Sequence, residues 1–97
     1  MAQQNQIGWH ATTIRTSGGL TLVQYHSTDV VAFDAKNVWL RSGGWRTATT
    51  KTRMNQASHQ FDLGYSVWQR DFSWYVTLSD GTVLNFEDGM KIPRKVA

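Results

Sequence analysis

A glycine-led segment is the first pattern in this sequence that could bind a ligand. It runs from Gly43 to Arg53 and reads GGWRTATTKTR. Glycine lets a backbone approach a ligand closely, and the residues that open a helix present free N–H groups that bind anions. An ordinary strand-to-helix turn, with Trp45 in the core and threonines as helix caps, is the structural alternative. The predicted phosphate-binding residues are Gly43, Gly44, Thr47 and Thr49.

Aromatic and cationic side chains alternate on two predicted strands, and this is the second pattern. Successive side chains of a strand point to opposite faces. We therefore expect Trp39 and Arg41 on the face away from the core, together with Trp68, Arg70 and Tyr75. Such rings stack on bases while the cations hold phosphates. Alternatively, a rolled sheet buries these rings as a second small core. The full predicted nucleic-acid-binding set is Trp39, Arg41, Arg46, Lys51, Arg53, Trp68, Arg70 and Tyr75.

The charge distribution also favours an anionic partner. The net charge is +3, but the stretch from Ala35 to Phe61 holds five cations and no Asp or Glu. This stretch therefore carries +5 and leaves −2 for the rest of the chain. A local basic field of this kind attracts nucleic acid, a nucleotide or an acidic protein. Five cations in these 27 residues are also compatible with an ordinary solvated surface.

Patterns that indicate catalysis are weak in this chain. The histidines His10, His26 and His59 lack the i, i+4 partner of a helical zinc site. The chain contains no cysteine, which excludes thiolate metal sites and disulfides. No nucleophile elbow of the form Gly-x-Ser-x-Gly occurs. We therefore expect a protein that is not an enzyme and that needs no cofactor or metal.

Antiparallel hairpins around one helix must position these side chains. Apolar and β-branched runs predict strands near 12–16, 20–26, 30–33, 38–41, 65–69, 73–78 and 82–86. The dipeptide Asp80-Gly81 is a strong hairpin signal between the last two strands. The prediction is an α+β domain with an antiparallel, strongly bent sheet of about six strands and one helix packed on one face. Its order is β-β-β-β-α-β-β-β, with or without the first strand.

The helix is predicted between Thr47 and Leu63. Its apolar stripe recurs at helical spacing and consists of Thr50, Met54, Ala57 and Phe61. Thr47, Thr49 or Thr50 supplies the N-cap oxygen, and Gly64 suits the left-handed position after the last turn. The outer face either meets solvent or enters a DNA major groove. That face is predicted to hold Thr49, Thr52, Arg53, Gln56, His59 and Gln60.

The length of 97 residues predicts a single domain, with flexible ends at 1–6 and 93–97. The first six residues have no basic and apolar regions typical of a secretory signal. No apolar run approaches the roughly 20 residues that span a bilayer, so we expect no membrane partner. The absence of cysteine favours a reducing compartment. These observations together predict a cytoplasmic protein.

The segment VWLRSGGWRTATTKTRMNQ, residues 38–56, resembles a family of small bacteriophage and metagenomic proteins. That family has a core of the form L-x-S-G-G-W-x-T-x-T-T-K-x-R-x-N-Q, and the likeness extends over about two-thirds of the chain with the flanking residues 25–31 and 61–64. The resemblance implies a phage origin, and therefore the host cytoplasm, but no catalytic or binding residue.

Three functional hypotheses follow from these patterns. The leading one is a small non-enzymatic domain that binds DNA or another nucleic acid. The alternative is a phage accessory protein, such as an anti-defence inhibitor, that binds a host or virion protein through an aromatic patch. The third is a small enzyme or nucleotide-binding protein that uses Gly43 and Gly44.

Overall fold

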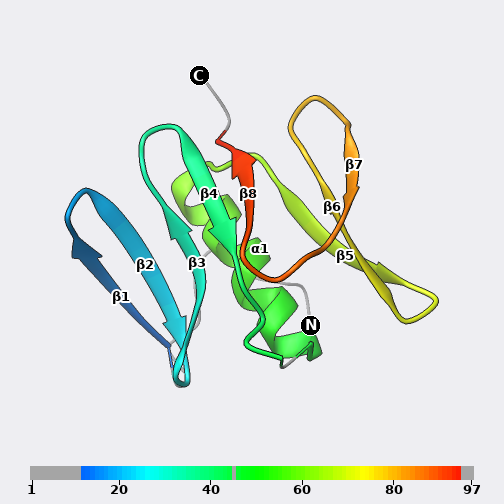
Figure 1. Ribbon diagram of the computed structural model, residues 1–97, viewed down its shortest axis with the longest axis horizontal. Helices are drawn as coiled ribbons and strands as arrows, with labels where there is room; N and C mark the ends of the chain where they lie inside the picture. Colours follow the sequence, from blue (N-terminus) through cyan, green and yellow to red (C-terminus); the bar gives the residue numbers. More distant parts are fainter. Residues whose placement is uncertain (1–11, 45, 95–97) are drawn as a thin grey trace.

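The computed structural model describes residues 12–44 and 46–94 of the chain. Strands form hairpins before and after a single described helix, and Figure 1 shows their arrangement. The elements are β1 Thr12–Ser17, β2 Leu20–Tyr25, β3 Thr28–Phe33, β4 Asn37–Leu40, α1 Ala48–Phe61, β5 Ser66–Arg70, β6 Ser73–Thr77, β7 Val83–Asn85 and β8 Met90–Pro93. No helix in the described ranges has the length and apolarity that crossing a bilayer requires.

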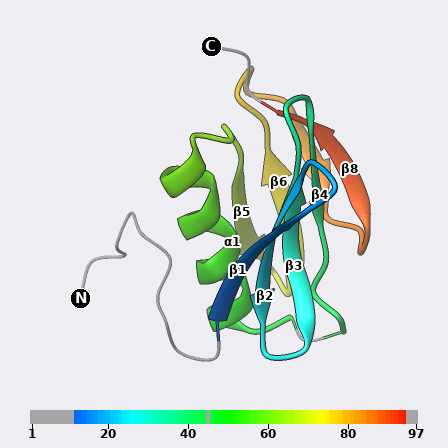
Figure 2. The same cartoon turned by 90° about the vertical axis from the view of Figure 1, so that its left-hand side faces the viewer.

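The larger sheet has five antiparallel strands in the order β1-β2-β3-β4-β8. The register aligns Val23, Val31 and Leu40 across its central strands, and none of these three side chains has exposed surface. This row faces α1, which lies along one face of the strands (Figure 2). Because successive side chains alternate between faces, the next row along each strand faces away from the helix.

The smaller sheet has three antiparallel strands in the order β5-β6-β7. Its inner side chains Val67, Trp74 and Val76 are buried and join the same core as the larger sheet. The edge strand β5 lies against α1, and side chains of the helix bond its backbone. The Asn55 amide donates to the Val67 carbonyl at 2.8 Å and accepts from the Val67 N–H at 2.7 Å. These bonds leave the Val67 backbone groups on this edge unavailable to another chain.

The helix begins where the threonine pattern predicts and ends earlier than the glycine indicates. Thr47 is the N-cap, and its Oγ1 accepts a hydrogen bond from the Thr50 N–H at 3.2 Å. The left-handed cap residue is Asp62, at φ 53°, so the prediction that Gly64 ends the helix is wrong. Gly64 also has positive φ, but it follows the cap by two residues.

The faces of the helix differ from the prediction at three positions. Thr50, Met54 and Ala57 are buried as expected, whereas Phe61 is only partly buried and packs on Phe33 at 4.8 Å between ring centroids. Arg53 and Gln56, predicted on the outer face, are buried at 9% and 5% exposure. The Arg53 side chain bonds Thr12 and Gln56, which makes its burial possible.

The predicted α+β class, the antiparallel pairing and the order β-β-β-β-α-β-β-β are confirmed. The strands form two sheets, of five and three strands, where the sequence predicted one bent sheet of about six. The structure adds a further strand, β8, which the sequence patterns did not indicate. It pairs with β4, and its last residue Pro93 lies opposite Asn37 although 93–97 was predicted to be flexible. Proline is tolerated there because β8 is an edge strand, which leaves one side without ladder bonds.

Candidate functional site

The face of the five-stranded sheet that points away from α1 carries an apolar row with cations at both ends. Trp39 on β4 lies in this row, opposite Ala32 on β3 and Lys91 on β8. Ala32 in turn lies opposite Leu22, and Leu22 lies opposite Arg15 on β1. Trp39, Ala32 and Leu22 are half-buried, whereas both cations are exposed. The row from edge to edge is Arg15, Leu22, Ala32, Trp39 and Lys91, and we call this surface the open sheet face.

A shallow hollow of about 210 Å³ lies on the open sheet face. Its apolar lining comes from Leu20, Leu22, Ala32 and Trp39, and Asp29 and Arg41 complete it. An indole beside an apolar hollow can stack on a flat ring, and a neighbouring guanidinium can hold an anion attached to that ring. Sequence alternation correctly predicted that Trp39 and Arg41 share this face.

The cations of the open sheet face differ in their partners. Arg15 makes a two-pronged ion pair with Asp29, at 2.8 and 2.9 Å, and also donates to Gln24. Arg41 and Lys91 are exposed and make no ion pair within the described residues. The face therefore keeps two cations available for an anionic ligand, while Asp29 is neutralised by Arg15.

Trp68, Tyr75 and Arg70 lie on the other sheet, so the predicted aromatic set is divided between two sheets. The rings of Trp68 and Tyr75 stack at 4.7 Å with an interplanar angle of 28°. The indole N–H of Trp68 donates to the Thr77 hydroxyl at 2.8 Å, which fixes the stacked pair. Both rings are half-buried, and the Arg70 side chain is 78% exposed.

Phe72 is the exposed aromatic residue that the sequence patterns missed. It is 96% exposed and lies at the tip of the β5–β6 hairpin, beside Asp71. Asp71 and Phe72 have φ of 51° and 69°, the left-handed values that a two-residue hairpin turn requires. The available signal was the spacing of the predicted strands 65–69 and 73–78, which leaves only residues 70–72 for the turn. Neither Asp71 nor Phe72 is the glycine or asparagine that usually marks such a turn.

Three of the cations predicted to bind nucleic acid contact other side chains of the fold instead. The Arg53 guanidinium is buried and lies 5.6 Å from the centroid of the Tyr25 ring. The Lys51 ammonium lies 5.8 Å from the Trp74 ring and bonds Gln69 at 3.4 Å. Arg46, which is 46% exposed, lies over the Phe86 ring at 5.2 Å. The continuous basic stretch of the sequence is therefore not one basic surface.

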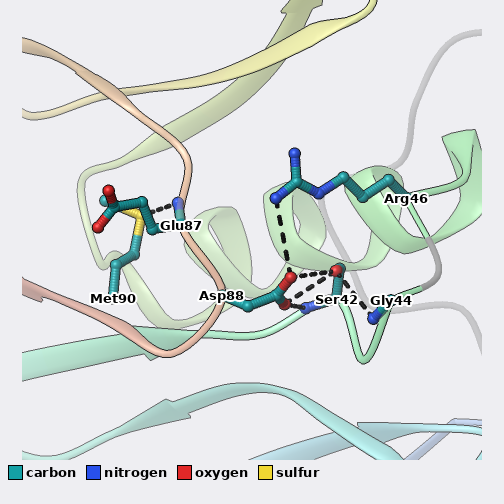
Figure 3. A network of polar contacts seen from close by, with 6 residues as sticks. All are labelled: Ser42, Gly44, Arg46, Glu87, Asp88 and Met90. Carbon is teal, nitrogen blue, oxygen red and sulfur yellow. Dashed lines mark hydrogen bonds and ion pairs between the residues drawn. The ribbon is translucent and has the colours of Figure 1, made fainter.

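The glycine turn holds an anion that the protein itself provides. Figure 3 shows the Asp88 carboxylate beside Ser42, whose backbone N–H and hydroxyl both donate to it, and beside Arg46 at 3.8 Å. Burial by itself would raise the pKa of Asp88, but the hydrogen bonds from Ser42 and the Arg46 charge outweigh it and lower that pKa. The Gly44 N–H donates to the Ser42 hydroxyl at 3.2 Å.

The predicted phosphate-binding residues therefore have different structural roles. Gly43 and Gly44 both have positive φ and form the turn, and Thr47 caps the helix. Thr49 is exposed in the first turn of α1. A phosphate at the turn would meet the Asp88 charge and the donors that Asp88 already occupies, so the phosphate site stays a prediction. Within the described ranges, no group of three His, Asp or Glu side chains could hold a metal ion.

Comparison with known proteins connects the chain to a viral family. The family model described as the Kyanoviridae Gp96 protein matches residues 1–93, which is nearly the whole chain. No curated protein and no solved structure matches the chain. The phage origin implied by the segment around Gly43 and Gly44 agrees with this match. The chain belongs to the Kyanoviridae Gp96 family, a family of phage proteins.

Proposed function

We propose that this phage protein is a non-enzymatic domain that binds single-stranded nucleic acid on its open sheet face. The observation that supports the proposal most directly is the half-buried Trp39 in a central apolar row, with exposed Lys91 opposite and exposed Arg41 just after the end of β4. A stacked base contributes about 1–3 kcal/mol, and the two cations add counterion release from phosphates. Both sources of affinity need the ring and the charges on the same surface.

A single strand suits this surface better than a duplex. Bases in a duplex stack on one another and do not present a flat face to a side chain, whereas unpaired bases do. The open sheet face has a flat indole and a hollow, but it has no protruding helix to enter a major groove. We propose the host cytoplasm as the location, because phage nucleic acid is present there.

Fluorescence anisotropy with labelled single-stranded and double-stranded oligonucleotides tests this function. We expect preferential binding of the single strand, with affinity that falls steeply between about 50 and 200 mM salt. Trp39→Ala should weaken single-strand binding by about 1–3 kcal/mol. Trp68→Ala, a half-buried tryptophan of the other sheet, is the matched control and should bind as the wild type does. Absence of binding at 50 mM salt, or equal loss in both variants, would refute the proposal.

A second function, binding of a host or virion protein, is favoured by Phe72. An aromatic ring at 96% exposure on a hairpin with exposed Arg70 has the composition of an interface hot spot. In a pull-down from nuclease-treated host lysate, Phe72→Ser should lose a stoichiometric partner that Val83→Ser retains. Val83 is also exposed on the three-stranded sheet and controls for general loss of apolar surface. A partner captured equally by both variants would contradict a role for Phe72.

A further inference from the structure

We propose that a hollow between the β2–β3 turn and the start of α1 is a nucleoside pocket. It has a volume of about 390 Å³, within the range of small-molecule sites. The inference that its ligand is a nucleoside, rather than another neutral ring compound, rests on the proposed function. The pocket would take one base with its sugar, either from the end of a bound strand or from a free nucleotide.

The lining of the pocket combines aromatic, apolar and hydroxyl groups. Tyr25 and His26 have ring centroids 4.4 Å apart, at an angle of 56°. Val30 adds apolar surface, and hydroxyls come from Thr28 and Thr47 among other residues. The described lining residues include no Asp, Glu, Lys or Arg. A neutral pocket with rings and hydroxyls matches a base and its ribose better than it matches a phosphate.

The walls of the pocket are fixed by contacts elsewhere in the fold. A Cβ added to Gly43 would collide with the Thr28 hydroxyl, so the glycine turn packs tightly on the β2–β3 hairpin. The Thr47 hydroxyl is held by its capping bond to Thr50, and the Arg53 guanidinium lies 5.6 Å from the Tyr25 ring centroid. A pocket with preformed walls loses less conformational entropy when a ligand binds.

A groove connects this pocket with the hollow beside Trp39. The groove, of about 720 Å³, shares Ser27 and Thr28 with the pocket. It shares Asp29 and Arg41 with the hollow on the open sheet face. Its two carboxylates are paired internally, Asp29 with Arg15 and Asp88 with Arg46. Arg41 is thus the unpaired charge of the groove among the described residues, between a site for one base and a site for the next.

Nuclear magnetic resonance titration with nucleosides and with a labelled single strand tests the pocket. Adenosine, guanosine, cytidine and uridine are the probes, with expected dissociation constants on the order of 0.1–1 mM. Binding should shift the amide signals of Thr28, Gly43 and Gly44. Thr28→Val removes one hydroxyl at constant shape and should weaken nucleoside binding about two- to tenfold. Thr21→Val, a half-buried threonine that lines none of the three hollows, is the matched control.

The outcomes separate the pocket from the proposed function. Nucleoside binding that weakens in Thr28→Val and persists in Trp39→Ala would support the pocket. If the Thr28→Val variant also binds the strand more weakly, the ligand includes a base of the strand, whereas an effect on nucleosides alone indicates a free nucleotide. Strand binding without any nucleoside-induced shift near Thr28 and Gly43 would refute the pocket and leave the open sheet face intact. Nucleoside binding in a protein that binds no strand would refute the proposed function and keep the pocket.

Discussion

At the scale of single residues, the Asp88 carboxylate occupies donors that a glycine turn could offer to a ligand. Asp88 is 46 residues from Ser42 in sequence, and the Ser42 hydroxyl lies 2.8 and 2.9 Å from its two oxygens. Ser42 itself is 1% exposed. Removal of the carboxylate would therefore leave a buried hydroxyl and a backbone N–H with a weaker acceptor or none, which destabilises a fold.

Asp88→Asn tests this contribution through its pH dependence. The pKa of Asp88 is lowered in the folded state, so its stabilising contribution is present above the unfolded value near 3.9. It is lost as the pH falls through the lower folded pKa. We expect the variant to be less stable at pH 7 by about 1 kcal/mol, since solvent screens a carboxylate that is 43% exposed. The difference from wild type should shrink as the pH falls from about 5 to 2.

Urea unfolding at a series of pH values measures this difference. Glu87→Gln is the control, because Glu87 is exposed and its side chain points away from the Asp88 cluster (Figure 3). That variant should keep the wild-type pH profile. A constant gap between wild type and Asp88→Asn across this pH range would contradict the role assigned to the Asp88 charge.

Gly43 and Gly44 give a second test at the residue scale. Both have positive φ, but a Cβ at Gly43 would also collide with Thr28, whereas one at Gly44 would meet open space. We expect Gly44→Ala to cost about 1 kcal/mol of stability from backbone strain, and Gly43→Ala to cost about 1–3 kcal/mol more from the collision. Thermal unfolding measures both. Adding Thr28→Ala should recover part of the Gly43→Ala loss, and equal losses in the two glycine variants would contradict the close packing.

At the scale of elements, the β5–β6 hairpin turns through Phe72, a residue type that does not favour positive φ. A residue with a side chain at φ near 60° costs roughly 1–2 kcal/mol, and Phe72 recovers nothing by packing because it is 96% exposed. Strain at an exposed aromatic residue is consistent with a binding role rather than a folding role. The hairpin is therefore the element in which stability and partner binding are expected to oppose each other.

Phe72→Gly should stabilise the protein by about 0.5–1 kcal/mol, because glycine adopts positive φ without strain. Phe72→Asn should act in the same direction, since asparagine tolerates this region. Urea denaturation with a constant m-value would measure the gain. Phe72→Ala keeps the strain and serves as the comparison. Lower stability in the glycine variant would mean that the phenyl ring contributes to the fold despite its exposure.

The helix shows why a phage-like sequence segment need not mark a binding surface. In the segment 38–56, Thr47 caps α1, Arg53 bonds Thr12, and Asn55 bonds both backbone groups of Val67. The Arg53 and Asn55 side chains hold elements together and are not available to a ligand, whereas Thr47 both caps α1 and lines the pocket beside it. The polar outer face predicted for the helix is correspondingly narrower than the sequence indicates.

At the scale of the whole molecule, α1 joins the two sheets. It contacts β2 and β3 of the larger sheet and β5 of the smaller one, and Met54 on its inner face has no exposed surface. The sheets also share one continuous apolar core. We therefore expect both sheets to unfold together in a single cooperative transition.

Asn55→Leu should lower the free energy of unfolding by about 2–3 kcal/mol, because two hydrogen bonds to part-buried backbone groups are lost. Far-ultraviolet circular dichroism and tryptophan fluorescence measure the transition with independent signals. The two signals should keep a common midpoint in the variant. Asn85→Leu, at an exposed position of β7, is the control and should cost less than about 0.5 kcal/mol. Separate midpoints would contradict cooperative unfolding.

The sequence by itself determined the helix, the strands β1 to β7 and the alternation of side chains along the strands, but not β8 or all of the helix faces. Strand alternation placed Trp39 with Arg41 on the outer face and Trp74 with Val76 inside, because the period of two is a local property of the chain. The threonine cap of the helix is equally local, since Thr47 bonds a residue only three positions ahead. Patterns that involve residues only a few positions apart can be read from the sequence without knowledge of the fold.

Only the tertiary structure decided which charges and rings remain available for a partner. Arg53 is buried against Thr12, Arg46 meets Asp88, and Arg15 meets Asp29, in contacts between residues 14 to 42 positions apart. The pairing of β4 with β8 likewise joins segments that lie on either side of the helix in sequence. Such pairings depend on the path of the chain through space, which no local period encodes. The net charge of the stretch from Ala35 to Phe61 therefore did not predict a single basic surface.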